Sequence, residues 1–253
     1  MFFTPILIWA LSPTQPDSHA QRHDVMVSAA TSLTDVLKEA AGSYERAARD
    51  RVVLNLGASN TLARQIAAGA RVDLFISADP AQMDIAAGSI DPGTRVDLLS
   101  NQLAIAVPDD RPRTFRSARE LLEPSMRRIA IGDPTAVPAG VYARTYLERL
   151  GIWRRIQPKL VPTGSVRLAL AAVEAGAVDA AIVYRTDIRT ATRAREAFVV
   201  PHEDGPRIVY PAAVVRNGPN PQGGRRFLAF LQTADAAAIF ERAGFVPLRA
   251  VGR

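Results

Sequence analysis

The chain has 253 residues, 48% hydrophobic and 22% charged, so it can bury a core in one large domain or in two smaller ones. It has no cysteine and three histidines (His19, His23 and His202), which excludes disulfides, thiolate chemistry and a multi-histidine metal site. Thirty-one basic against 25 acidic residues give a net charge of +6, spread along the chain, which favours a general attraction for anions over a nucleic-acid interface.

The first 20 residues have the pattern of a signal peptide. An apolar run from Phe2 to Leu11 is too short to span a bilayer and has the length of a signal-peptide core. Ser18 and Ala20 are the small residues that precede a cleavage point. We therefore expect residues 1–20 to be removed and the mature protein to be periplasmic. No Lys or Arg precedes the run, so a mis-assigned start or a disordered tail is the alternative.

Strand and helix patterns alternate through the rest of the chain. Short apolar runs predict strands at residues 25–30, 52–56, 73–77, 103–107, 128–131, 178–183 and 208–215. Apolar residues at helical spacing predict helices at residues 33–44, 62–68, from 80 onward, 139–150, 165–175, 221–233 and 234–243. This alternation is typical of α/β proteins with largely parallel sheets.

Hydroxyl side chains stand where several of these helices begin. Ser32 follows the first strand, and Ser59, Asn60 and Thr61 follow the second. Ser165 precedes a later helix. Free N–H groups at helix starts attract anions, and ligands of open α/β sheets bind at such junctions. By itself each serine is better explained as an ordinary N-cap; Ser32, with Asp35 three residues on, has that pattern.

Two further positions complete the set of candidates. In Val137-Pro138-Ala139-Gly140, the small side chains leave the amides of Ala139 and Gly140 approachable at a helix start. Tyr184 ends a predicted strand, where packing is the ordinary explanation for an aromatic residue. The residues alone therefore indicate a secreted α/β protein that could bind an anion.

A set of strings, in order and with matching gaps, resembles the periplasmic molybdate-binding proteins of bacterial ABC importers. The strings are AATSLTD (29–35), ASNTLARQI (58–66), VDLFISAD (72–79), GDP (132–134) with VPAG (137–140), VR (166–167) with AAIVY (180–184), YPAAVV (210–215) and IFERAGF (239–245). The resemblance covers residues 25–248. It implies a two-lobe binding-protein fold of the type II kind, each lobe a mostly parallel sheet flanked by helices.

The resemblance also implies where the lobes and the ligand lie. We expect lobe 1 to contain residues 24–102 and 211–253 and lobe 2 to contain residues 103–210, with two crossover strands and the ligand in the cleft between the lobes. Carried over position by position, it places the oxyanion contacts on Ser32, Ser59, Ala139, Val166 and Tyr184. Asn60, Thr61 and Gly140 are secondary candidates.

The resemblance implies binding without chemistry or cofactor. Two serine hydroxyls, several helix-start amides and one phenol would surround a tetrahedral dianion that only accepts hydrogen bonds. Molybdenum would be held as the oxyanion, with no bond from protein to metal, and tungstate, of nearly the same size, should bind too. Asn60 replaces a common serine and Gly164-Ser165 a common acidic pair, so these departures bear on selectivity.

We therefore expect a monomer that captures molybdate by hinge closure and delivers it to the permease and ATPase subunits of an importer, with no nucleic-acid partner. The alternative in the same class is a binder of sulfate or another tetrahedral oxyanion. A less favoured alternative is a secreted serine hydrolase with Ser32 or Ser59 as nucleophile. Against it, the sequence has no Gly-x-Ser-x-Gly elbow, and only His23 and His202 could act as the base. An effector domain of a transcription regulator would need a DNA-binding helix pair before residue 25.

Overall fold

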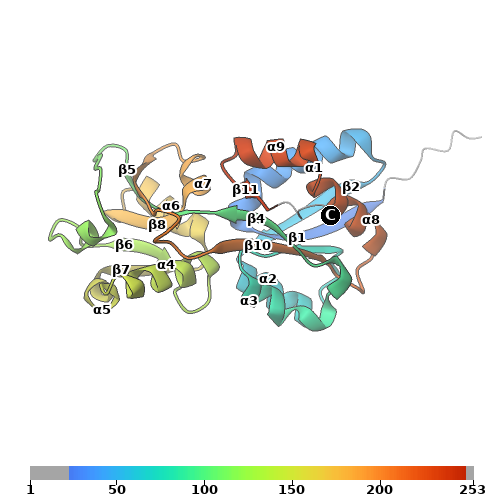
Figure 1. The fold of residues 1–253 in the computed structure, drawn as a ribbon, viewed down its shortest axis with the longest axis horizontal. Coiled ribbons are helices and arrows are strands. Elements are labelled where there is room, and N and C mark those ends of the chain that lie inside the picture. The colour runs from blue at the N-terminus through green and yellow to red at the C-terminus, as the bar shows by residue number, and fades with distance from the viewer. Residues whose placement is uncertain (1–22, 249–253) are drawn as a thin grey trace, which may run out of the picture.

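The structure is a computed structural model that describes residues 23–248, in which two β-sheets are each surrounded by helices (Figure 1). The two sheets lie side by side along the long axis of the molecule, so the predicted two-lobe α/β class is confirmed. The predicted signal peptide lies outside the described residues. Within residues 23–248, no helix combines the length and the apolar character that a bilayer crossing requires.

The first sheet has six strands in the order β11-β4-β10-β3-β1-β2. They are β1 (Asp24–Ala30), β2 (Arg51–Gly57), β3 (Leu74–Ile76), β4 (Val96–Asn101), β10 (Ile208–Val214) and β11 (Val246–Pro247). The α-helices of this body are α1 (Thr34–Ala47), α2 (Ser59–Ala67), α3 (Pro80–Ile85), α8 (Pro221–Leu231) and α9 (Ala234–Arg242). A short 3-10 helix, η1 (Thr31–Leu33), connects β1 to α1.

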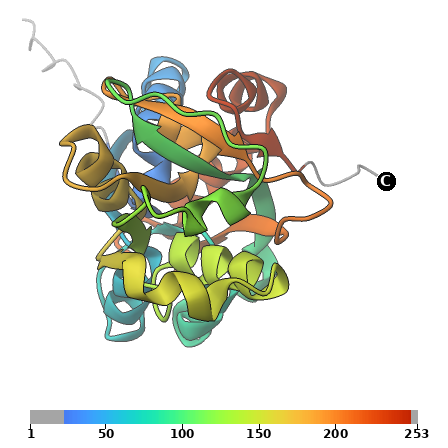
Figure 2. The same ribbon diagram turned by 90° about the vertical axis from the view of Figure 1, so that its left-hand side faces the viewer.

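The second sheet has five strands in the order β7-β6-β8-β5-β9. They are β5 (Leu103–Pro108), β6 (Ile129–Gly132), β7 (Leu160–Thr163), β8 (Ala180–Tyr184) and β9 (Ala194–Val199). Its α-helices are α4 (Pro138–Arg149), α5 (Trp153–Ile156), α6 (Val166–Glu174) and α7 (Arg185–Ile188). Figure 2 looks onto this body, with α4 and α5 in yellow-green and yellow below the sheet.

Both sheets are mixed, which differs from the mostly parallel sheets that we expected. The parallel pairs are β1 with β2 and β3, and β6 with β7 and β8. A parallel pair needs a crossover connection, and α1, α4 and α6 supply such helices. By contrast, β4 leads directly into β5 of the other sheet, and β10 returns to pair antiparallel with β3 and β4. The strands that connect the two bodies therefore account for the antiparallel pairs.

The chain passes between the sheets at two places. It leaves the six-stranded sheet after Asn101 and enters the five-stranded sheet at Leu103, so Gln102 is the junction residue. It returns between Val199 and Ile208. The boundary that we set at residue 210 falls inside β10, which already pairs with β4 from Ile208.

Four strands and one helix start differ from the sequence pattern. The pattern missed β4, β7, β9 and β11. Pro162 interrupts β7, and β9 is an edge strand that carries Arg195 and Glu196, so neither has the apolar run of a buried strand. The predicted N-cap at Ser32 is wrong: Ser32 lies inside η1, and α1 begins at Thr34 with no side-chain cap.

The strand ends position the candidate residues. β5, β6, β8 and β10 are buried along their whole length, which fixes the centre of each body. The carboxyl ends of β1 and β2 lead into η1 and α2, and β8 ends at Tyr184. Helix starts and strand ends from both bodies therefore meet between the two sheets (Figure 1).

Candidate functional site

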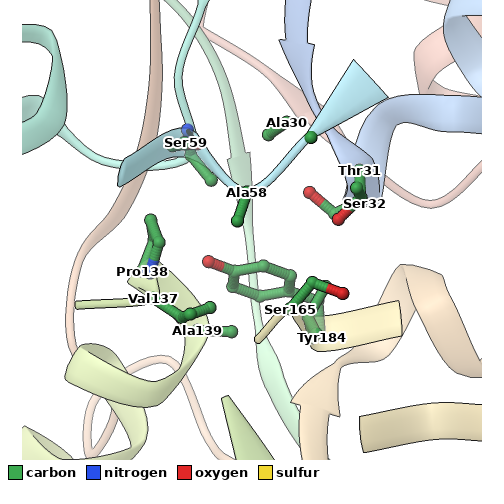
Figure 3. Close-up of a pocket in the computed structure, with 13 residues that line it drawn as sticks. Ala30, Thr31, Ser32, Ala58, Ser59, Val137, Pro138, Ala139, Ser165 and Tyr184 are labelled. Carbon is green, nitrogen blue, oxygen red and sulfur yellow. Dashed lines mark hydrogen bonds between the residues drawn. The ribbon is translucent and has the colours of Figure 1, made fainter. Parts of the chain in front are cut away.

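One pocket between the two sheets brings together all five residues that the sequence placed around a ligand (Figure 3). The six-stranded body supplies residues 30–32, 57–59 and 78, and the five-stranded body supplies residues 137–139, 165–166 and 184. The space measures about 230 Å³ including its opening to solvent. Pockets for drug-sized ligands measure roughly 300–1,000 Å³, so this one suits a more compact ligand.

The secondary candidates Asn60, Thr61 and Gly140 are not among the residues that line this pocket. Thr61 is exposed on α2. A Cβ at Gly140 would collide with the backbone oxygen of Gly132, so this glycine allows α4 to approach β6 closely. Asn60 is buried beside the pocket, and its Oδ1 has no hydrogen-bond partner among the described residues. The structure therefore separates these three positions from the five primary ones.

Three α-helices begin at residues that line the pocket. Ser59 is the first residue of α2, Val166 is the first residue of α6, and Ala139 is the second residue of α4. The first N–H groups of a helix have no acceptor within the helix, and the helix dipole gives that end a partial positive charge. Ser165 is the N-cap of α6, because its hydroxyl accepts the N–H of Leu168 at 3.3 Å. These starts make the pocket suited to an anion.

Ser59 is held so that its hydroxyl can donate. Its Oγ accepts the backbone N–H of Ala78 at 2.9 Å, and the residue is 1% exposed. The N-cap of α2 is Ala58, and no side chain caps this helix. Because the oxygen already accepts a hydrogen bond and performs no capping, the hydroxyl proton of Ser59 remains for a ligand in the pocket.

Ser32 also caps no helix. Its Oγ lies 3.2 Å from the hydroxyl of Tyr210, and both residues are buried. Tyr210 stands in the central strand β10 and does not line the pocket. Tyr210 lies in the string YPAAVV (210–215) but was not predicted to be a site residue. The feature that could have indicated a role for Tyr210 is its place in the middle of an otherwise apolar strand, where a hydroxyl needs a hydrogen-bond partner.

The hydroxyl of Tyr184 is an unpartnered polar group. The residue is 1% exposed, and its hydroxyl has no hydrogen-bond partner within residues 23–248. Burial raises the pKa of Tyr184 well above the ordinary value for a phenol, so the group keeps its proton and stays a donor. A buried donor without an acceptor costs about 1–3 kcal/mol, and a ligand oxygen would remove that cost.

The lining of the pocket contains no Asp, Glu, His, Lys or Arg. Arg167, next to Val166, forms two ion pairs instead. Its guanidinium lies 2.7 Å from the carboxylate of Asp35 on α1 and 3.0 Å from the carboxylate of Asp187 on α7. Burial raises the pKa of Asp187 to about 7, while Arg167 opposes that shift. The pocket can therefore hold an acceptor-only anion by neutral donors, and its lining offers no carboxylate or imidazole as a base.

No three His, Asp or Glu side chains within residues 23–248 come together as a metal site. His23 and His202, which a serine hydrolase would need, do not line the pocket.

Comparison with known proteins agrees with this geometry. Residues 25–246 match the family model described as bacterial extracellular solute-binding protein. The molybdate-binding protein ModA of Escherichia coli K12 is 38% identical over 234 residues, which are 89% of this chain and 90% of the relative.

Two solved structures share the fold. The periplasmic molybdate-binding protein of Azotobacter vinelandii has a TM-score of 0.80 at 24% identity, over 88% of this chain and 98% of that one. The sulfate-binding protein SubI of Mycobacterium tuberculosis has a TM-score of 0.73 at 18% identity, over 90% and 88%. The resemblance found in the sequence is confirmed, and the chain belongs to the family of bacterial extracellular solute-binding proteins.

Proposed function

We propose that this chain binds molybdate in the pocket between its two sheets and delivers it to an ABC importer. The observation that carries the proposal is the arrangement of Ser32, Ser59 and Tyr184 with the amides of Ala139 and Val166 around one small space that no charged side chain lines. The similarity to proteins named as molybdate-binding supports the choice of anion.

The donor set matches a tetrahedral dianion. The four oxygens of molybdate accept hydrogen bonds and donate none, and the pocket offers the hydroxyls of Ser32, Ser59 and Tyr184 together with helix-start amides. Each hydrogen bond to a charged group contributes about 1.5–3 kcal/mol. Helix dipoles distribute the compensating charge, so binding needs no arginine in contact with the ligand.

Size and protonation set the selectivity. Sulfate has the same shape and charge as molybdate but is smaller, so the fit of the pocket discriminates between them. Tungstate is nearly the size of molybdate, and we propose that it binds as well. Phosphate carries a proton at neutral pH, and a site made of donors leaves that proton without an acceptor, at a cost of about 1–3 kcal/mol.

We further propose a periplasmic location, a monomer and closure of the two lobes about their connecting strands. The signal-peptide pattern of residues 1–20 supports the location. The division into residues 24–102 with 211–253 and residues 103–210 assigns each half of the pocket lining to one lobe. Opening and closing then admits the anion and presents the closed lobes to the permease, while the ATPase drives transport. We also propose that the protein performs no reaction of its own, which is supported by a pocket lining without a carboxylate or imidazole.

Isothermal titration calorimetry with molybdate, tungstate, sulfate and phosphate at pH 7.5 tests this proposal. We expect one molybdate per chain, similar affinity for tungstate, and at least about 100-fold weaker binding of sulfate and phosphate. Equal or tighter binding of sulfate would move the protein to the sulfate binders. Failure of all four anions to bind would reject an oxyanion function.

A further inference from the structure

A buried chain of hydrogen bonds leads from the junction between the two sheets to the pocket. The backbone N–H of Gln102 donates to Oδ1 of Asn101 at 2.8 Å. The Nδ2 of Asn101 donates to the hydroxyl of Tyr210 at 3.2 Å and to Oγ1 of Thr186 at 2.8 Å. The hydroxyl of Tyr210 in turn lies 3.2 Å from Oγ of Ser32. Five residues from both bodies thus connect one crossover to one ligand position.

The backbone at Gln102 fixes the direction of every bond in this chain. An N–H can only donate, so the oxygen of the Asn101 amide must face Gln102, and its NH2 group must face Tyr210. The oxygen of Tyr210 therefore accepts from Asn101. Burial keeps the pKa of Tyr210 far above its ordinary value, so its hydroxyl always carries a proton. That proton has Ser32 Oγ as its one acceptor among the hydrogen bonds of the described residues.

The direction of the Ser32 hydroxyl proton follows in the same way. Because Tyr210 donates to its oxygen, the proton of Ser32 points away from Tyr210, and the pocket is the space that this side chain faces (Figure 3). Ser59 is also left as a donor, because its Oγ accepts the N–H of Ala78. Both serine hydroxyls are thus arranged as donors before any ligand arrives.

We propose that Tyr210 is a positioning residue that holds Ser32 as a hydrogen-bond donor and so selects fully deprotonated oxyanions; this inference rests on the proposed function. A ligand hydroxyl that donates to Ser32 would leave the serine proton with no acceptor, since Tyr210 donates to Ser32 and so cannot accept from it. A serine without this constraint could turn and accept instead. Tyr210 therefore acts on specificity without touching the ligand.

A double-mutant cycle tests whether Tyr210 acts through Ser32. Tyr210→Phe keeps the ring and removes the hydroxyl, and we expect it to weaken molybdate binding about 3- to 10-fold. Ser32→Ala should weaken it about 10- to 100-fold. The double variant should bind like Ser32→Ala within about 2-fold, because the hydroxyl of Tyr210 then has nothing to orient. Full additivity would overturn the proposal, since it would mean that Tyr210 acts on the fold and not on Ser32.

Tyr44→Phe is the matched control, because Tyr44 is also buried and donates its hydroxyl to an acceptor, Asp50 at 2.7 Å, away from the pocket. It should leave molybdate affinity unchanged.

The second readout is selectivity, measured by competition of phosphate against molybdate at one pH. In Tyr210→Phe the preference for molybdate over phosphate should fall several-fold, and in Tyr44→Phe it should not change. An unchanged preference in Tyr210→Phe would overturn the part of the proposal that concerns specificity.

If the wild-type protein binds sulfate in place of molybdate, the proposed anion is wrong, and the same cycle measured with sulfate still tests Tyr210. A wild-type protein that binds neither anion would contradict both proposals.

Discussion

The guanidinium of Arg167 lies 2.7 Å from the carboxylate of Asp35 and joins the helix α6 of one body to the helix α1 of the other. Arg167 also contacts the fully buried Asp187 within its own body, which fixes its direction. Ser32, Asp35 and Arg167 line one crevice between the bodies, so the ion pair lies close to the proposed ligand site. If the two bodies close on the ligand as proposed, this ion pair stabilises their closed arrangement.

Asp35→Asn should therefore weaken molybdate binding by a small factor. Asp35 is half exposed, and an exposed ion pair contributes about 0.2–1 kcal/mol, so we expect a loss of about 2- to 5-fold that disappears at high salt. Calorimetry at two salt concentrations measures it. Glu39→Gln is the matched control, because Glu39 is also on α1 and pairs with Arg242 inside the same body. Equal effects of the two substitutions would exclude a role for Arg167–Asp35 in closure.

Ser59→Ala should weaken molybdate binding about 10- to 100-fold, since it removes a hydroxyl that is arranged to donate. The backbone fold should persist, because Ser59 caps no helix. Calorimetry gives the affinity and far-ultraviolet circular dichroism checks the fold. A folded variant with wild-type affinity would show that Ser59 does not contact the ligand.

Tyr184→Phe should have opposite effects on affinity and on stability without ligand. The hydroxyl is buried without a partner, so its removal should leave the ligand-free protein equally stable or up to about 1–3 kcal/mol more stable. The loss of a donor should nevertheless weaken molybdate binding about 10-fold or more. Urea unfolding and calorimetry measure the two quantities. A variant that loses stability while keeping its affinity would assign Tyr184 to the core alone.

The sequence predicted the class of fold and most of its central strands, because these strands are continuous apolar runs that follow from burial on both faces. It did not predict β9, whose edge position tolerates Arg195 and Glu196. It could list Ser32 and Ser59 but could not separate a ligand contact from a cap, since both use the same residue type in the same place. The structure decides the capping question through the partners of each hydroxyl.

The sequence pattern could not predict contacts between residues that are far apart in the sequence. Tyr210 and Ser32 are 178 positions apart, and Arg167 and Asp35 are 132 apart. Periodicity and motif spacing describe local structure, so neither pair had a signal that the sequence alone could supply.

Val166→Pro tests a backbone contact directly. Proline is tolerated at the first residue of a helix, and Ser165 before it has the extended backbone that proline prefers. The substitution removes the N–H of Val166, so we expect molybdate affinity to fall about 10-fold with helicity unchanged. Ala234→Pro is the matched control at the first residue of α9, outside the pocket. If both variants bind like the wild type, the amide of Val166 is not a contact.

Asp187 predicts a particular pH dependence of stability. Burial raises its pKa to about 7 in the folded protein, above its ordinary value near 3.8. Between these values the folded protein holds a proton that the unfolded chain has lost, so this group's contribution to the free energy of unfolding decreases as pH rises. The difference in free energy of unfolding between wild type and Asp187→Asn should therefore fall by on the order of 3 kcal/mol between pH 4.5 and 8. Urea unfolding at both pH values measures it, and parallel pH profiles for the two proteins would contradict it.

The most direct measurement is anomalous diffraction at the molybdenum edge from crystals grown with molybdate. The account predicts one strong peak between the two sheets, with ligand oxygens within hydrogen-bond distance of Ser32 Oγ, Ser59 Oγ and the hydroxyl of Tyr184. The amides of Ala139 and Val166 should complete the contacts. A peak elsewhere on the molecule, or no peak in crystals grown with excess molybdate, would contradict the assignment of this pocket.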